Sequence, residues 1–228
     1  MRPRQLASVV LLALAPSLVL ADRRLDEVEE GIEAGDCEIE AGFERSRVRG
    51  RMRQRENAVT LACGIGWGSE LTLAAGRERA GTQRVDVRAL ELKLPLLPRR
   101  ERAVGWALEA ALADERSAGR SWRRNEYALL LEATVTPRPD WLAEVKLGWA
   151  RELHPRADRT VFALGVEHAL SETWEARAEL EGDDREPASA ALELRWIFVE
   201  DFYVTLGFGK RLGGDRERLW GLTLGIEF

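Results

Sequence analysis

The chain ends in Trp220-Gly-Leu-Thr-Leu-Gly-Ile-Glu-Phe228, a segment in which large apolar side chains alternate with small or polar ones. A period of two is typical of a β-strand, because successive side chains point to opposite faces of a sheet. Every large apolar side chain of this segment falls on the same face, and the last of them is aromatic. The segment therefore predicts a strand with one apolar and one polar face.

The same alternation extends upstream as far as residue 36. It comes in segments of about ten residues, which is the length of a tilted membrane-spanning strand. We predict twelve of them, at 36–46, 56–67, 69–77, 84–94, 103–113, 125–136, 140–150, 160–169, 173–181, 188–198, 201–210 and 218–228. An even number of strands places both ends of the sheet on one side of a membrane.

Charged side chains recur on the polar face of these segments. Charges at every second position cannot face lipid, so we expect them to line a polar interior. The candidate lumen-facing residues are Glu109, Glu132, Glu144, Lys146, Glu175, Arg177, Glu179, Glu193 and Arg195. Glutamate predominates on this face, and a focused negative field favours cations. The alternative is that these groups only solvate the wall, pair across strands or fill a narrow barrel.

A soluble β-sandwich also alternates, but two features favour a barrel. Tight connections alternate with longer charged ones, which we expect at 47–55, 114–124, 151–159 and 211–217. Short periplasmic turns and longer external loops are typical of transmembrane barrels. A change of phase near Ala89 to Glu91 predicts a bulge in the fourth strand.

Aromatic residues provide the second feature, since amphipathic rings favour the membrane interface. The predicted periplasmic strand ends carry Trp67, Trp141, Trp174, Phe198, Phe202 and Phe228, and the opposite ends carry Tyr127, Trp149 and Trp220. The predicted fold class is thus all-β, a transmembrane antiparallel up-and-down β-barrel of about twelve strands.

The N-terminal residues predict export. Arg2 and Arg4 precede an apolar run, and Ala21 ends a small-residue cleavage site, so residues 1–21 are predicted to be a cleaved signal peptide. Residues 22–35 are acidic and lack alternation, which predicts a periplasmic N-terminal tail, and residues 36–228 form the barrel. The expected location is the cell outer membrane, although a charged content of 32% also fits a soluble secreted protein.

The chain has two cysteines, Cys37 and Cys63, which are equidistant from Gly50 in the first predicted hairpin. They face each other if Gly50 is its midpoint, and an exported chain reaches a compartment that permits disulfides. A disulfide and two free thiols both remain open. The spacing of the cysteines does not indicate a metal site, and we expect no cofactor.

Arginine recurs at every second position of the first predicted hairpin tip. The residues are Arg45, Arg47, Arg49, Arg51, Arg53 and Arg55. Guanidinium groups bind phosphate in a bidentate manner, and the outer leaflet carries phosphorylated lipopolysaccharide. We expect contact with outer-membrane lipid and lipopolysaccharide. A nucleic-acid partner is not expected, because the predicted signal peptide exports the chain.

The sequence predicts no enzyme. His154 and His168 are its two histidines, and neither has a convincing serine nucleophile, although Ser171 follows His168 closely. We expect both to be surface residues. The predicted function is a channel for passive diffusion of small solutes. The alternatives are a structural barrel that does not conduct and an outer-membrane enzyme that modifies lipid.

Two resemblances extend these expectations. Termination on an aromatic strand resembles the signal by which the barrel-assembly machinery recognises outer-membrane proteins, and the matching residues are Trp220, Leu222, Leu224, Ile226 and Phe228. The C-terminal third resembles the proteobacterial outer-membrane transporter family of the meta pathway of phenol degradation. The matching segments are 162–168, 170–174, 178–182, 192–196, 204–210 and 222–228.

The second resemblance implies a passive diffusion barrel and, by the name of that family, a hydrophobic or aromatic solute. The oligogalacturonate-specific porin family is another possible relative with twelve strands. It implies acidic sugars, which fit an acidic lumen poorly.

Overall fold

The computed structural model describes residues 32–47, 53–97, 104–154, 156–199, 201–213 and 217–228. The predicted signal peptide at 1–21 and most of the predicted tail at 22–35 lie outside these residues, as do Arg49 and Arg51 of the first hairpin.

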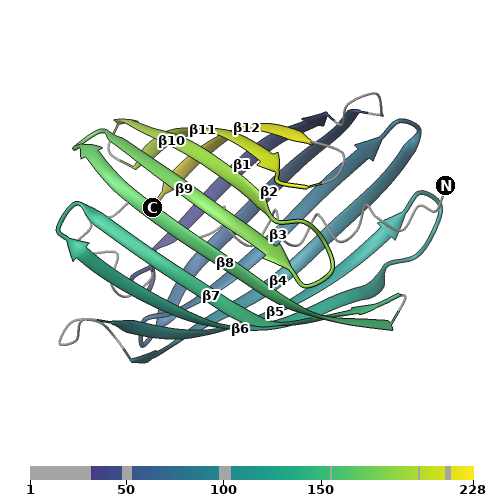
Figure 1. The fold of residues 1–228 in the computed structure, drawn as a ribbon, viewed down its shortest axis with the longest axis horizontal. Helices are drawn as coiled ribbons and strands as arrows, with labels where there is room; N and C mark the ends of the chain where they lie inside the picture. Colours follow the sequence, from purple (N-terminus) through teal and green to yellow (C-terminus); the bar gives the residue numbers. More distant parts are fainter. Residues whose placement is uncertain (1–31, 48–52, 98–103, 155, 200, 214–216) are drawn as a thin grey trace.

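A single antiparallel sheet of twelve strands closes on itself to form a barrel (Figure 1). Each strand pairs with its neighbours in sequence, and β1 closes the barrel by pairing with β12 from Glu38 opposite Glu227 to Arg47 opposite Arg218. The strands are β1 (Cys37–Arg47), β2 (Arg53–Gly66), β3 (Ser69–Ala80), β4 (Gln83–Leu97), β5 (Gly105–Ser117), β6 (Arg123–Arg138), β7 (Trp141–Leu153), β8 (Arg156–Ser171), β9 (Trp174–Asp183), β10 (Ser189–Val199), β11 (Phe202–Arg211) and β12 (Arg218–Glu227). The predicted fold class and strand count are confirmed.

Several strands are longer than the sequence predicted, at the end of the barrel opposite to the chain's C-terminus. The prediction of long loops at 114–124 and 151–159 is wrong, because β5 and β6 leave only residues 118–122 between them and β7 reaches Leu153 before β8 begins at Arg156. The charged residues there pair across strands, as Asp114 does with Arg88 at 2.9 Å, and this pairing lets polar sequence continue the sheet.

The predicted bulge near Ala89 is also wrong. Strand β4 keeps an unbroken register with both neighbours at that point, and its irregularity lies between Pro95 and Leu97, where proline has no N–H to donate. The alternation changes phase in the sequence because, in the first half of β4, an apolar side chain faces inward and a charged one faces outward. Val87 lies buried on the inner face, whereas Arg88 lies exposed on the outer one.

The outer face of the barrel is apolar over its middle. Large aliphatic and aromatic side chains remain exposed there, among them Val59, Leu73, Leu147, Leu192, Phe208 and Leu224. Exposure of so wide an apolar surface to water is unfavourable, whereas its contact with lipid is not. Closure of the sheet also pairs the backbone N–H and C=O groups, which lipid could not satisfy. The outer face is therefore the lipid-facing surface of a transmembrane barrel. No helix in the described part of the chain has the length and apolar character needed to cross a membrane.

Aromatic rings gather at both rims of this apolar band. At the rim nearest the C-terminus, Trp174 stacks on Trp196 with ring centroids 5.8 Å apart, and Phe198 lies 5.5 Å from Trp196. At the opposite rim, Tyr127 lies 5.5 Å from Trp149. Such rings mark the two interfaces of a membrane with water.

A disulfide joins Cys37 to Cys63. The two residues lie directly opposite each other in the β1–β2 register, with their Cα atoms 4.1 Å apart. Of the two states that the sequence leaves open, the structure therefore contains the bonded one. The bond secures the start of the strand that closes the barrel with β12.

Candidate functional site: the barrel interior

The inner face of the barrel carries the charged residues that the sequence assigns to the lumen. Register and burial place on it Glu109, Glu132, Glu144, Lys146, Glu175, Arg177, Glu179, Glu193 and Arg195. Many of them are buried although they face the axis of a barrel; Glu109 and Glu132 are each only 2% exposed. Neighbouring side chains must therefore fill the space around them.

A cluster of two lysines and two glutamates occupies the inner face of β4 to β7, and we call it the lysine cluster. Lys146 Nζ lies 2.7 Å from Glu109 Oε1 and 3.3 Å from Glu132 Oε2, and Lys93 Nζ lies 2.8 Å from Glu132 Oε1. Each buried charge here has an opposite charge in hydrogen-bond range or close to it, as burial requires. The cluster joins three neighbouring pairs of strands and narrows the barrel.

Arginines continue the pairing along the next strands. Arg177 on β9 pairs with Glu144 on β7 at 2.6 Å and lies 3.7 Å from Glu179. Gly165 of the intervening strand β8 makes room for this contact, because a Cβ atom at that position would overlap the Glu144 carboxylate. Glycine is thus needed at this point on the inner face.

Tyr203 is the centre of a further buried group. Its hydroxyl donates a hydrogen bond to Glu40 at 2.6 Å and contacts Glu38, and the Arg195 guanidinium lies over its ring at 4.3 Å. Gly225 lies directly opposite Tyr203 and leaves the space that the phenol ring occupies. The sequence prediction did not single out Tyr203; its place between the outward-facing Phe202 and Val204 was the available signal.

Arg159 was also missed, because its segment was expected to be a loop. It lies on the inner face of β8, where it is 4% exposed, and its guanidinium pairs with Glu126 at 2.6 Å and Asp183 at 3.1 Å. The side chain therefore ties β6 to β9 across β8.

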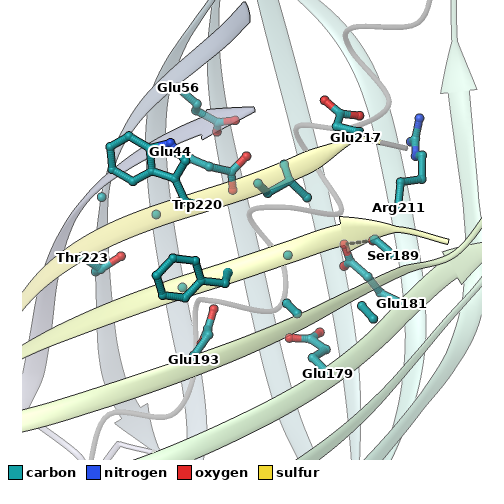
Figure 2. A pocket seen from close by; sticks show the side chains of 18 of the residues that line it. Glu44, Glu56, Glu179, Glu181, Ser189, Glu193, Arg211, Glu217, Trp220 and Thr223 are labelled. Carbon is teal, nitrogen blue, oxygen red and sulfur yellow. Dashed lines mark hydrogen bonds between the residues drawn. The ribbon is translucent and has the colours of Figure 1, made fainter. Parts of the chain in front are cut away.

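A cavity of about 190 Å³ lies inside the barrel against β1, β2 and β9 to β12 (Figure 2). We call it the acidic cavity, because six of its carboxylates have no cation within hydrogen-bond distance among the residues that the structure describes. They are Glu44, Glu56, Glu179, Glu181, Glu193 and Glu217. Among the lining residues that the structure describes, Arg211 is the single cation, and it pairs with Glu186 at 2.7 Å. Small residues such as Gly207 and Gly221 leave the volume open.

The histidines lie away from these groups. His168 is on the outer face, stacked on Trp141 with centroids 4.2 Å apart, and its Nδ1 is 2.9 Å from the carbonyl oxygen of Asp140. His154 lies in the short connection between β7 and β8. Within the described ranges, no three His, Cys, Asp or Glu side chains lie close enough together to hold a metal ion.

Arginines of the first four strands lie on the outer face, between the apolar band and the end of the barrel opposite to the C-terminus. Four of them stand directly opposite one another on adjacent strands and form what we call the arginine belt: Arg45, Arg55, Arg79 and Arg84. Arg47 continues the outward face of β1, and Arg53 lies opposite it in the register. Beside the belt, the guanidinium groups of Arg88 and Arg116 both lie 4.7 Å from the ring of Trp122.

A closed barrel with an apolar outer band, aromatic rims and a charged interior defines a class: the chain is a β-barrel of the outer-membrane type. Within that class, it belongs to the family described as "Uncharacterised conserved protein UCP029691", whose model matches residues 12–228. No curated protein sequence matches the chain.

Solved structures of outer-membrane channels share this fold. The NanC porin has a TM-score of 0.63 at 8% identity, covering 82% of this chain and 98% of its own. The KdgM porin in complex with disordered oligogalacturonate has a TM-score of 0.60 at 9% identity, covering 83% and 99%. The COG4313 outer membrane channel from Pseudomonas putida F1 has a TM-score of 0.57 at 11% identity, covering 88% and 98%. At these identities the likeness shows the fold.

Proposed function

We propose that the chain is an outer-membrane channel through which small cationic solutes diffuse passively in preference to anions. The acidic cavity supports this proposal most directly, since its carboxylates outnumber the cations of its described lining and lie inside a barrel that shares its fold with porins. A negative field inside a low-dielectric wall concentrates cations and repels anions. The lysine cluster and the arginine pairs occupy the inner faces of β4 to β10.

The charge of the cavity lining also indicates which charge the solute carries. Oligogalacturonate, the ligand named for KdgM, is a polyanion, and a lining in which described carboxylates outnumber described cations would repel it. The resemblance to the meta-pathway transporters suggests an aromatic solute, but the described lining of the acidic cavity is dominated by carboxylates and small residues. We therefore assign to this barrel a cationic solute rather than an acidic sugar or a neutral aromatic compound.

The proposal is tested by recording ion currents of the mature protein in planar bilayers. We expect discrete current steps, with K⁺ more permeant than Cl⁻. The triple variant Glu44→Gln/Glu56→Gln/Glu217→Gln removes charge from one wall of the acidic cavity and is expected to lower the ratio of K⁺ to Cl⁻ permeability severalfold. The Glu172→Gln variant, at an exposed turn between β8 and β9, makes the same type of substitution once outside the cavity and should keep the ratio. Protein that inserts without conducting would leave the structural barrel as the better account.

We also propose that the arginine belt contacts phosphate groups of outer-leaflet lipid. Like charges directly opposite each other on a sheet repel, so an anion between them stabilises the pair of strands. Arg55 and Arg79 are exposed, and no acidic group among the described residues forms an ion pair with Arg45, Arg55 or Arg79. A phosphate accepts two parallel hydrogen bonds from a guanidinium, which suits this surface.

Diphosphoryl lipid A is therefore expected to raise the temperature at which the folded barrel converts to its unfolded form on gels. The Arg55→Gln/Arg79→Gln variant should lose most of this increase, because it removes the centre of the belt. Arg138→Gln makes the same type of substitution once, at the opposite end of the barrel, and should retain the increase. Equal increases in all three proteins, or an increase produced equally by dephosphorylated lipid A, would contradict the proposal.

A further inference from the structure

The acidic cavity contains buried polar atoms that form no hydrogen bond with the described residues. Glu179 Oε1, Glu181 Oε2 and the Thr205 hydroxyl are buried without a hydrogen-bond partner among the described residues, and all three residues line the cavity. The Glu179 side chain is only 8% exposed, and its other oxygen lies 3.7 Å from Arg177. A buried acceptor without a donor is costly, so these positions favour a ligand that brings hydrogen-bond donors.

The carboxylates stand on two walls of the cavity (Figure 2). Glu179, Glu181 and Glu193 come from β9 and β10, while Glu44 and Glu56 come from β1 and β2. Within the described residues, no three of these groups converge closely enough to coordinate a metal ion. A single small cation cannot neutralise both walls at once, whereas an elongated cation with separated charges can.

The floor between the walls suits a hydrocarbon chain. It consists of small groups on the inner faces of β11 and β12, including Gly207, Gly209 and Gly221, and the cavity measures about 190 Å³. The interior already contains an ammonium group between two glutamates, since Lys146 Nζ lies between Glu109 and Glu132 in the lysine cluster. An ammonium group has three donors and fits between carboxylates of this kind.

We propose that the acidic cavity binds a linear organic cation with two or more ammonium groups, a diamine or polyamine. Its ammonium groups donate to the carboxylates of the two walls, Glu179 and Glu181 on one and Glu44 on the other, and its methylene chain lies over the glycines of β11 and β12. The site rests on the proposed function in one respect: such a cation would be the solute that the channel admits.

Isothermal titration of spermidine into the detergent-solubilised mature protein tests the site. We expect saturable binding that weakens at least about tenfold in Glu179→Gln/Glu181→Gln, because each lost charged hydrogen bond changes affinity by about that factor. The Gly207→Leu variant keeps every charge but fills the cavity, and it should also lose binding. Glu172→Gln should bind as the unmodified protein does, and n-butylamine, with one ammonium group, should bind more weakly than spermidine.

The outcomes separate this inference from the proposed function. Absence of saturable spermidine binding would overturn the proposed site, and so would displacement of spermidine by Mg²⁺ added at an equal total concentration of positive charge. Cation-selective currents measured without spermidine would still support the channel in either case. Spermidine binding that needs Glu179 and Glu181, in a protein that carries no current, would support the site and refute the channel.

Discussion

The Lys146→Met variant is expected to unfold far more readily than the unmodified barrel. Lys146 lies between Glu109 and Glu132, and its side chain is only 8% exposed. Its removal leaves two buried carboxylates with one ammonium group beside them among the described residues, that of Lys93. Breaking a buried pair by removing one partner costs about 3–5 kcal/mol, because the remaining charge is desolvated without compensation. The measurement is the urea-induced unfolding transition of the protein refolded into lipid vesicles.

A second substitution separates charge from packing. Lys146→Met/Glu109→Gln removes one carboxylate together with the lysine, so we expect it to recover part of the lost free energy of unfolding. Lys210→Met, at an exposed outward position on β11, removes the same type of charge and should leave the transition where it is. If Lys146→Met unfolds at the same urea concentration as Lys210→Met, the lysine cluster does not stabilise the barrel.

Deletion of residues 220–228 is expected to abolish the folded barrel. These residues form nearly all of β12, which lies between β11 and β1. Phe228 also exchanges two backbone hydrogen bonds with Cys37, of 2.8 and 2.9 Å. Without them, two strand edges would face lipid with unpaired N–H and C=O groups, each costing several kcal/mol. The truncated chain should show no heat-modifiable migration on gels and no protected core after trypsin treatment.

Phe228→Ala distinguishes closure of the barrel from recognition during assembly. This variant keeps every backbone group of β12, so we expect it to refold into vesicles in vitro. If the terminal aromatic residue is also an insertion signal, the same variant should accumulate poorly in the outer membrane of cells. A truncated chain that still becomes trypsin-resistant would contradict the requirement for closure by β12.

The strand count and the two faces of the barrel could be predicted because alternation with a period of two is a local property. The strand ends could not be predicted as well, because they depend on partners that are remote in the sequence. Asp114 looked like loop sequence, yet it lies between Arg88 and Arg124 on the neighbouring strands, and these ion pairs extend the sheet. Polarity alone does not mark the end of a strand when the neighbouring strand supplies the opposite charge.

The interior shows the same division between local and remote information. The sequence indicates which face Glu109 and Lys146 occupy, but their contact depends on how two successive hairpins, β5–β6 and β6–β7, are aligned. The hydrogen bond from Tyr203 to Glu40 joins residues at opposite ends of the chain, which only closure of the barrel brings together. The acidic cavity likewise requires β1 and β9 to face each other across the interior. The alternation of apolar and polar residues does not show which strands face each other in this way.

The sign of the reversal potential in a KCl gradient tests the central claim most directly. The protein inserted in a planar bilayer, with tenfold more KCl on one side, should give a zero-current potential of the sign set by the K⁺ gradient if the acidic cavity favours cations, as we propose. The Glu44→Gln/Glu56→Gln/Glu217→Gln variant should shift it toward zero. A zero-current potential of the sign set by the Cl⁻ gradient would contradict the account.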